Sequence, residues 1–185
     1  MAFGLDLAIL IGVALSILLF VPRAAKLKVT ELVVDADDVV RDKLPADSPN
    51  AGFLIYDLEG ELFFGAAPEL DRTFAQIAAR AHQQGLDHVL LRLKRVRNPD
   101  VVSLERFEHF LRHAQATGIT VWLAGLKPDL LDAFRRLNFS AWLPEDRVFP
   151  LGADEESATL AAIRCIRFKV HGAESVQPDK LFYLV

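Results

Sequence analysis

The sequence predicts an α/β fold, a sheet whose strands alternate with helices, preceded by one transmembrane helix. Apolar residues recur at helical spacing in several segments after residue 67, and short aliphatic runs lie between these segments. Strands that alternate with helices of this length form right-handed crossovers, which place the helices on the faces of a sheet. An apolar run at the N-terminus predicts the transmembrane helix.

The N-terminal run has the composition of a membrane-spanning helix. Residues 2–21 are apolar apart from Asp6 and Ser16, and about 20 such residues are enough to cross a bilayer. Three basic residues follow this run: Arg23, Lys26 and Lys28. Because basic residues favour the cytoplasmic side, we expect residues 1–22 to attach a cytoplasmic domain to the inner membrane. A buried core helix and an uncleaved export signal are the alternatives.

The next segment contains one strand and a connection. The β-branched run KVTELVV, residues 28–34, predicts a strand. Residues 35–50 are acidic and interrupted by prolines, which indicates a short helical turn or a loop. We therefore expect residues 23–51 to be a linker that includes a first strand.

A hairpin is expected to open the main domain. Two apolar runs within residues 52–65 flank Glu59 and Gly60, a pair suited to a tight turn. A helix is expected next, because apolar residues share one helical face between Pro68 and Gly85.

The alternation then continues to the end of the domain. Strands are expected at residues 88–93 and 119–125, and helices at residues 103–118, 128–138 and 153–169. Ser103 is a candidate N-cap for the first of these helices. Residues 139–150 are irregular, with a short edge strand at residues 148–149. The expected domain covers residues 52–169, and residues 170–185 form a tail.

The composition argues against several classes of protein. A net charge of −4 and a pI near 5.7 argue against a nucleic-acid-binding protein. The single cysteine, Cys165, excludes an internal disulfide framework and a multi-cysteine zinc site, and its apolar neighbours predict a buried helix position. The sequence contains no glycine-rich phosphate loop and no nucleophile elbow, so we expect no cofactor and no enzymatic activity.

A histidine pair raises the question of a metal site. His109 and His113 stand at i and i+4 of a predicted helix, which is the spacing of two zinc ligands on one face. The stretch reads HFLRH, without the glutamate base of the zinc hydrolases, and no third ligand is evident. We interpret the pair as part of a solvated helix face, with a small metal-dependent enzyme as the alternative.

A second segment is suited to an anion. The stretch LAGLKPDLL, residues 123–131, contains a strand, a loop and the N-terminus of a helix, whose N–H groups attract negative charge. Gly125 and Lys127 are the residues expected to contact an anion or a nucleotide there.

A longer stretch carries a family likeness. The run VLLRLKRVRNPDVVSLERFEHFLRHAQATGITVWLAGLKPDLLDAFRRLNF, residues 89–139, resembles the core of a STAS domain, the module of sulfate transporters and anti-sigma-factor antagonists. More narrowly, it is similar to the cytoplasmic C-terminal STAS domain of SulP-type anion permeases. The likeness covers residues 52–139 and the last predicted helix. The N-terminal apolar run with its basic residues and ELVV strand resembles the last transmembrane helix of such a permease and its connection to STAS.

The resemblance also interprets the turn that precedes the helix at residues 103–118. The family pattern D-x-[ST]-G aligns with Asp100, Val101, Val102 and Ser103. Val102 takes the place of the phosphorylated Ser or Thr, and Ser103 takes that of the glycine. Because valine has no hydroxyl, a phosphate switch at this position is excluded. The four residues are expected to form a regulatory or interaction turn without the switch.

The resemblance implies the regulatory or interaction domain of a SulP-type transporter of sulfate or another inorganic anion, as part of a larger protein. The partners it implies are the membrane, the transporter membrane domain or another protein, and a second copy in a homodimer. No nucleic acid, cofactor or metal is expected. The alternative is a protein like an anti-sigma-factor antagonist, acting in partner switching without the usual phosphorylatable residue.

Overall fold

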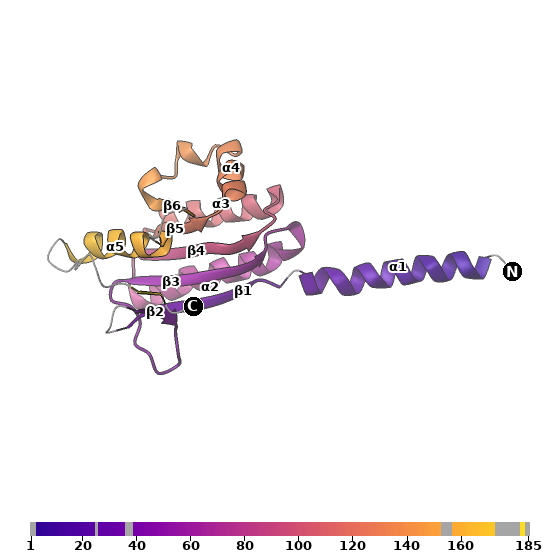
Figure 1. Ribbon diagram of the computed structural model, residues 1–185, viewed down its shortest axis with the longest axis horizontal. Helices are drawn as coiled ribbons and strands as arrows, with labels where there is room; N and C mark the ends of the chain where they lie inside the picture. Colours follow the sequence, from indigo (N-terminus) through magenta and orange to yellow (C-terminus); the bar gives the residue numbers. More distant parts are fainter. Residues whose placement is uncertain (1–2, 25, 36–38, 153–156, 173–181, 184–185) are drawn as a thin grey trace.

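The structure is a computed structural model that describes residues 3–24, 26–35, 39–152, 157–172 and 182–183 (Figure 1). Its described strands are β1 (Lys28–Val34), β2 (Val39–Asp42), β3 (Phe53–Glu61), β4 (His88–Arg97), β5 (Thr120–Leu126), β6 (Val148–Pro150) and β7 (Phe182–Tyr183). The helices are α1 (Phe3–Ala24), α2 (Ala67–Gln84), α3 (Val101–Ala116), α4 (Pro128–Arg136) and α5 (Ala158–His171), with short 3-10 helices η1 (Phe64–Ala66), η2 (Phe139–Ala141) and η3 (Glu145–Arg147). The predicted α/β fold is confirmed.

The strands form one mixed sheet in the order β6-β5-β4-β3-β1-β2-β7. Strands β3 to β6 run parallel to one another, whereas β1 is antiparallel to both β3 and β2. Since Lys28 at the start of β1 pairs with Glu59 near the end of β3, β1 begins where the parallel strands end. We call the ends of β3, β4 and β5 the carboxyl edge of the sheet; α1 leaves the domain at this edge (Figure 1).

Helices cover both faces of the sheet because neighbouring strand residues point to opposite sides. On one face, Leu91 and Leu123 belong to a large cluster with the aromatic side chains of α2 and α3, among which Phe74 and Phe110 stack at 4.2 Å between ring centroids. On the other face, the strands contribute to a smaller cluster with α5. Its buried members include Ile55, Leu90, Trp122, Ile163 and Ile166.

The expected hairpin within residues 52–65 is wrong. Strand β3 continues through Glu59 and Gly60 without turning, and β1 is its antiparallel partner. A Cβ at Gly60 would lie 3.0 Å from the Lys26 carbonyl oxygen. The glycine therefore allows β3 to lie close to the segment that leads into β1, and it does not form a turn. The local sequence pattern fits both a hairpin and one continuous strand. The pairing of β3 with the distant β1 determines that the strand is continuous.

The expected helical turn or loop at residues 35–50 contains a strand. Residues Val39–Asp42 form β2, which pairs with β1, and Val40 is fully buried. Two hydrogen bonds between Asp35 and Val39 close the connection between β1 and β2. The Val39 N–H donates to the Asp35 carboxylate, and the Asp35 N–H donates to the Val39 carbonyl, each at 3.0 Å. This four-residue strand, VVRD, has no alternation of apolar and polar residues, so the sequence alone did not indicate it.

The remaining elements lie close to their predicted positions, with two corrections. Helix α5 begins at Ala158, and residues 153–156 of the expected helix lie outside the described residues. Cys165 is exposed rather than buried, because it points away from the face on which Ala162 and Ile166 pack against the sheet.

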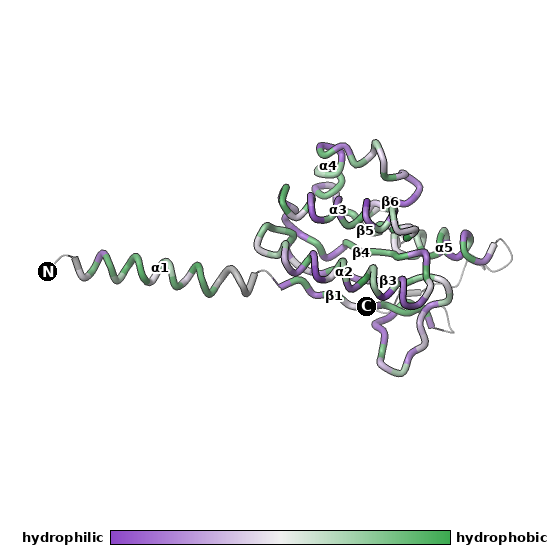
Figure 2. The backbone as a smooth tube through the Cα atoms, turned by 180° about the vertical axis from the view of Figure 1, so that it is seen from behind, coloured by the Kyte–Doolittle hydropathy of each residue, from purple (hydrophilic) through white to green (hydrophobic). Residues whose placement is uncertain are grey.

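Helix α1 projects from the domain, and most of it is apolar (Figures 1 and 2). Among the residues that the structure describes, no helix has the length and apolar character needed to cross a membrane, so the span expected at residues 1–22 is not supported.

Candidate functional site

The turn between β4 and α3 lies at the carboxyl edge of the sheet, where ligands and partners of open α/β folds often bind. Strand β4 ends at Arg97 and α3 begins at Val101. Between them, Asn98 has a φ of 49°, in the left-handed region that asparagine tolerates better than most residues. Its side-chain amide donates to the Glu61 carboxylate. The turn is therefore fixed to the end of β3.

Asp100 connects three segments at this turn. Its Oδ1 accepts a hydrogen bond from the Ser103 N–H at 2.8 Å, which makes Asp100 the N-cap of α3. Its Oδ2 accepts one from the Phe64 N–H at 2.5 Å. Partial burial acts to raise the pKa of Asp100, but the bonds from Ser103 and Phe64 outweigh it and hold this pKa below its usual value. The N-cap expected at Ser103 is therefore wrong, because Asp100 has the extended backbone that a cap requires.

Ser103 is sealed beneath the turn. Its surface is 0 % exposed, its hydroxyl donates to the Leu62 carbonyl at 2.6 Å, and the same oxygen lies 2.8 Å from Oδ1 of Asp100. A phosphate here would place about two negative charges in a buried site. Ser103 thus links α3 to the end of β3. Its buried hydroxyl cannot serve as the phosphate acceptor that position 102 lacks.

The outer surface of the turn is apolar. Val101 and Val102 are 59 % and 41 % exposed, and Phe64 in η1, which contacts α3, is 63 % exposed. We call these three residues the turn patch. The resemblance to the family turn identified the two valines from the sequence. It did not identify Phe64, which bonds to Asp100 although the two residues are 36 positions apart in the sequence.

Gly125 and Lys127 lie at the same edge, at the end of β5. Gly125 is buried with a φ of 75°, and a Cβ there would lie 3.1 Å from the Cβ of Lys94, so the glycine lets β5 approach β4. The Lys127 ammonium donates to the Val96 carbonyl at 3.1 Å. The ammonium is thus used within the fold, and the anion or nucleotide contact at Gly125 and Lys127 stays a prediction.

His109 and His113 lie on an exposed face of α3 beside α2. Their rings are parallel, with centroids 6.4 Å apart, and they line a groove of about 480 Å³ together with His82 and Arg106. Within the described ranges, no group of three or more His, Cys, Asp or Glu side chains is arranged to hold a metal ion.

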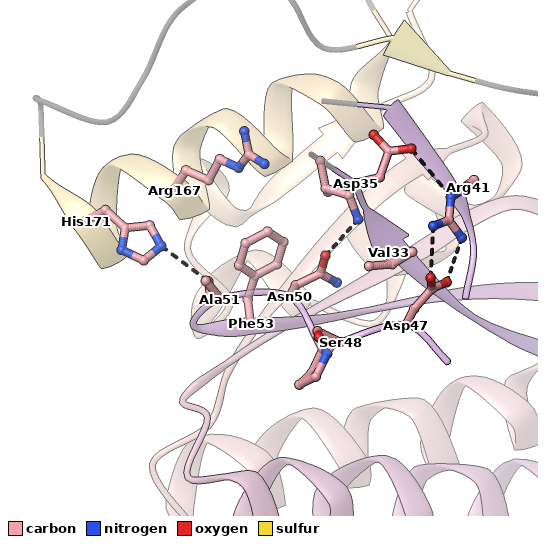
Figure 3. Close-up of a pocket in the computed structure, with 12 residues that line it drawn as sticks. Val33, Asp35, Arg41, Asp47, Ser48, Asn50, Ala51, Phe53, Arg167 and His171 are labelled. Carbon is pink, nitrogen blue, oxygen red and sulfur yellow. Dashed lines mark hydrogen bonds and ion pairs between the residues drawn. The ribbon is translucent and has the colours of Figure 1, made fainter. Parts of the chain in front are cut away.

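A polar cavity of about 570 Å³ lies between β1, β2 and the end of α5 (Figure 3). On one side, Arg41 makes two hydrogen bonds to Asp47, at 2.6 and 3.0 Å. The bond from Arg41 is the main cause that lowers the pKa of Asp47 to about 2. On the other side, His171 of α5 lies 3.2 Å from the Ala51 carbonyl. No sequence motif indicated this cavity, because residues more than a hundred positions apart form it.

A buried ion pair crosses the sheet between β3 and β4. Asp57 and Arg92 are 7 % and 8 % exposed at their side chains, and their nearest atoms are 2.9 Å apart. Arg95 lies 3.8 Å from the same carboxylate oxygen. Burial raises the pKa of Asp57 above its usual value, although both arginines act to lower it.

The match to a family profile assigns this chain to a known class of domain. The sequence profile of the STAS domain matches residues 47–158, which is more than half of the chain, so this chain belongs to the STAS domain family. No match appears among curated protein sequences.

Two solved structures with TM-scores above 0.5 show the same fold, and a third is similar with a lower score. A sulfate transporter family protein from Wolinella succinogenes is 24 % identical, with a TM-score of 0.53 over 74 % of this chain and 98 % of that chain. Murine Slc26a9, an anion transporter in the inward-facing state, is 16 % identical, with a TM-score of 0.68 over 86 % of this chain. The match covers 25 % of the Slc26a9 chain. The anti-sigma factor antagonist SpoIIAA is 17 % identical, with a TM-score of 0.47 over 65 % of this chain and 93 % of that chain.

Proposed function

We propose that this chain is the regulatory or interaction STAS domain of a SulP-type transporter of sulfate or another inorganic anion. It acts without enzymatic activity on the cytoplasmic side of the membrane, through contacts with the transporter membrane domain. Residues 52–169 are its main domain, whose sheet β1 and β2 extend, and α1 attaches it to the apolar part of the membrane.

One observation carries this proposal, the exposed apolar surface of α1. Leu5, Leu10 and Leu18 on this helix are 69 %, 65 % and 68 % exposed. Continuous apolar surface of this kind is rare on soluble monomers and marks contact with a partner or a membrane. Lipid and the helices of a transporter are apolar surroundings that suit such a helix. The similarity to the Wolinella protein, a sulfate transporter family protein, supports this class of partner.

The turn argues against partner switching through phosphorylation. Position 102 carries a valine, and the neighbouring hydroxyl of Ser103 is buried and hydrogen-bonded within the fold. A turn that keeps its shape without an accessible hydroxyl is suited to a constant protein or membrane contact.

The proposal is tested by transport. The DNA on both sides of this coding segment is read for further apolar segments, and the whole transporter is expressed in cells that lack their own sulfate uptake. Removal of residues 26–185 should lower the uptake of radiolabelled sulfate several-fold at an equal amount of membrane-inserted protein. Unchanged uptake, or the absence of any adjoining or co-expressed transporter region, would contradict the proposal.

A further inference from the structure

We propose that the turn patch, with the basic residues around it, docks this domain on the surface of a bilayer that contains anionic lipid. The inference rests on the proposed function in one respect, the placement of α1 in the membrane. It adds a second, reversible contact that α1 alone does not provide.

The position of the patch follows from the way α1 joins the sheet. Helix α1 contacts η1, the segment that contains Phe64. Strand β1, which follows α1, begins beside the end of β3, as the pairing of Lys28 with Glu59 shows. With α1 in the membrane, the carboxyl edge is therefore the part of the domain nearest to the lipid headgroups (Figure 1).

The patch has the form of a small apolar tip. Val101 and Val102 occupy the first turn of α3, where Asp100 fixes the backbone, and their side chains remain exposed. Phe64 lies in η1, which contacts α3, and its backbone N–H bonds to Asp100; its ring is in edge-to-face contact with Phe63 at 5.5 Å between centroids. An aromatic ring and short aliphatic side chains on a rigid turn are suited to the boundary between headgroups and acyl chains.

Positive charge gathers along the carboxyl edge on which this tip lies, although the whole chain carries a net charge of −4. Five exposed basic residues lie on the carboxyl edge or beside it: Lys26, Lys28, Lys94, Arg95 and Arg97. Three carboxylates also lie at this edge and bond within the fold: Glu59 pairs with Arg95 at 3.2 Å, Glu61 accepts from Asn98, and Asp100 accepts from Ser103 and Phe64. They offset part of the positive charge, and the basic residues of the edge outnumber them. A cluster of basic side chains beside a membrane attachment is attracted to anionic lipid.

The same residues are poorly suited to a protein surface. Lysine is depleted in the buried centres of protein interfaces, because a desolvated ammonium requires a fixed partner. Among the described residues, no ion pair involves Lys26, Lys28 or Lys94. Flexible lysines around a small apolar tip suit a fluid layer of headgroups better than a fixed protein surface.

The test uses the full chain in lipid nanodiscs and a nitroxide label at one cysteine. Cys165 is the single native cysteine and is exposed, so Cys165→Ser provides the background. Labels are placed at the patch (Val101→Cys), on α1 (Leu10→Cys) and, as a matched control, eight positions further along α3 (His109→Cys). Discs of phosphatidylcholine alone are compared with discs of phosphatidylcholine and phosphatidylglycerol in equal parts, by access of the label to oxygen and to a water-soluble nickel chelate.

In the anionic discs, the label at Val101→Cys should show access to oxygen and a several-fold loss of access to nickel. The His109→Cys label should remain open to nickel in both discs. Combining Lys28→Gln, Lys94→Gln and Arg97→Gln should restore nickel access at the patch while thermal unfolding stays unchanged.

Two results would overturn the inference. A patch label open to nickel in both discs excludes docking, while lipid contact at Leu10→Cys shows that the placement of α1 still holds. A label at Val101→Cys that neither nickel nor oxygen can reach indicates that protein, and not lipid, contacts the turn patch. If the Leu10→Cys label is open to nickel, the membrane attachment in the proposed function itself fails.

Discussion

Asp100 illustrates how much of this site depends on one side chain. Its two carboxylate oxygens bond the N–H groups of Ser103 and Phe64, which lie on different segments. The first bond caps α3, and the second holds η1 beside it. The exposed valines of the turn patch therefore keep their positions because a polar residue behind them fixes the backbone.

Asp100→Ala is expected to lower the free energy of unfolding by about 1–2 kcal/mol, because a helix N-cap is lost together with the bond from Phe64. Urea unfolding followed by circular dichroism measures this change. Asp100→Asn should recover only the part of the loss that comes from the cap, since asparagine caps helices well but its amide NH₂ cannot accept the bond from Phe64. An equal loss in both variants would show that the cap at Ser103 contributes little to the stability.

Asp47 gives the fold a dependence on acid pH. Its pKa is about 2 in the folded chain against an ordinary 3.8, mainly because of the bond from Arg41. A carboxyl whose pKa is depressed by folding contributes stability above pH 3.8 and loses it as the pH falls toward 2. Asp47→Asn should therefore reduce the loss of stability across this window, as measured by thermal unfolding at a series of pH values. Asp129→Asn, at an exposed carboxylate of α4, is the control for removal of one charge. Identical pH profiles for wild type and Asp47→Asn would refute the assignment.

At the scale of elements, β3 and β4 carry a charged pair in a sheet that is otherwise mostly apolar. Asp57 and Arg92 face each other in the parallel register and are almost fully buried. Desolvation of the two charges offsets much of their attraction, as the raised pKa of Asp57 indicates. The pair therefore matters most when one member is missing.

Arg92→Met is expected to cost about 3 kcal/mol, because it leaves the Asp57 carboxylate buried with only the more distant Arg95. The double variant Asp57→Val with Arg92→Met should return close to the stability of the wild type. Chemical unfolding of the wild type, both single variants and the double variant forms a double-mutant cycle that measures the coupling. Additive losses would mean that the pair contributes no coupling energy.

At the scale of the whole molecule, the described residues form mainly a STAS domain and a projecting apolar helix. The domain buries its own core on both faces of the sheet, whereas the described large side chains of α1 are exposed. The domain therefore does not bury α1, and in the proposed function the membrane and the transporter bury it.

Charge placed on α1 is expected to release the chain from membranes. The pair Ile9→Lys and Val13→Lys, on one face of α1, should move the full chain from the carbonate-resistant membrane fraction to the soluble fraction. Immunoblotting of the two fractions measures the shift. The pair Glu105→Lys and His109→Lys on the exposed face of α3 adds two lysines at the same spacing and should leave the distribution unchanged. If the α1 pair leaves the chain in the membrane fraction, α1 is not its means of attachment.

Local patterns predicted most elements because their causes are local. The helical spacing of apolar residues and the glycine at position 85, whose φ is 64°, predicted α2 and its end. The aliphatic runs predicted β4 and β5, and the family turn marked Asp100 as part of the site. Local signals failed where a distant segment decided, as in the continuous β3, in β2 and in the exposed side of α5 at Cys165.

The alternating α/β fold, the STAS likeness and the exclusion of a phosphate switch at Val102 follow from the residues alone, because spacing and the absence of a hydroxyl are properties of single residues and their neighbours. The cap at Asp100, the burial of Ser103 and the position of Phe64 near the turn follow from the three-dimensional fold. These features depend on hydrogen bonds and packing between β3, η1 and α3, segments that the chain brings together only when the sheet forms.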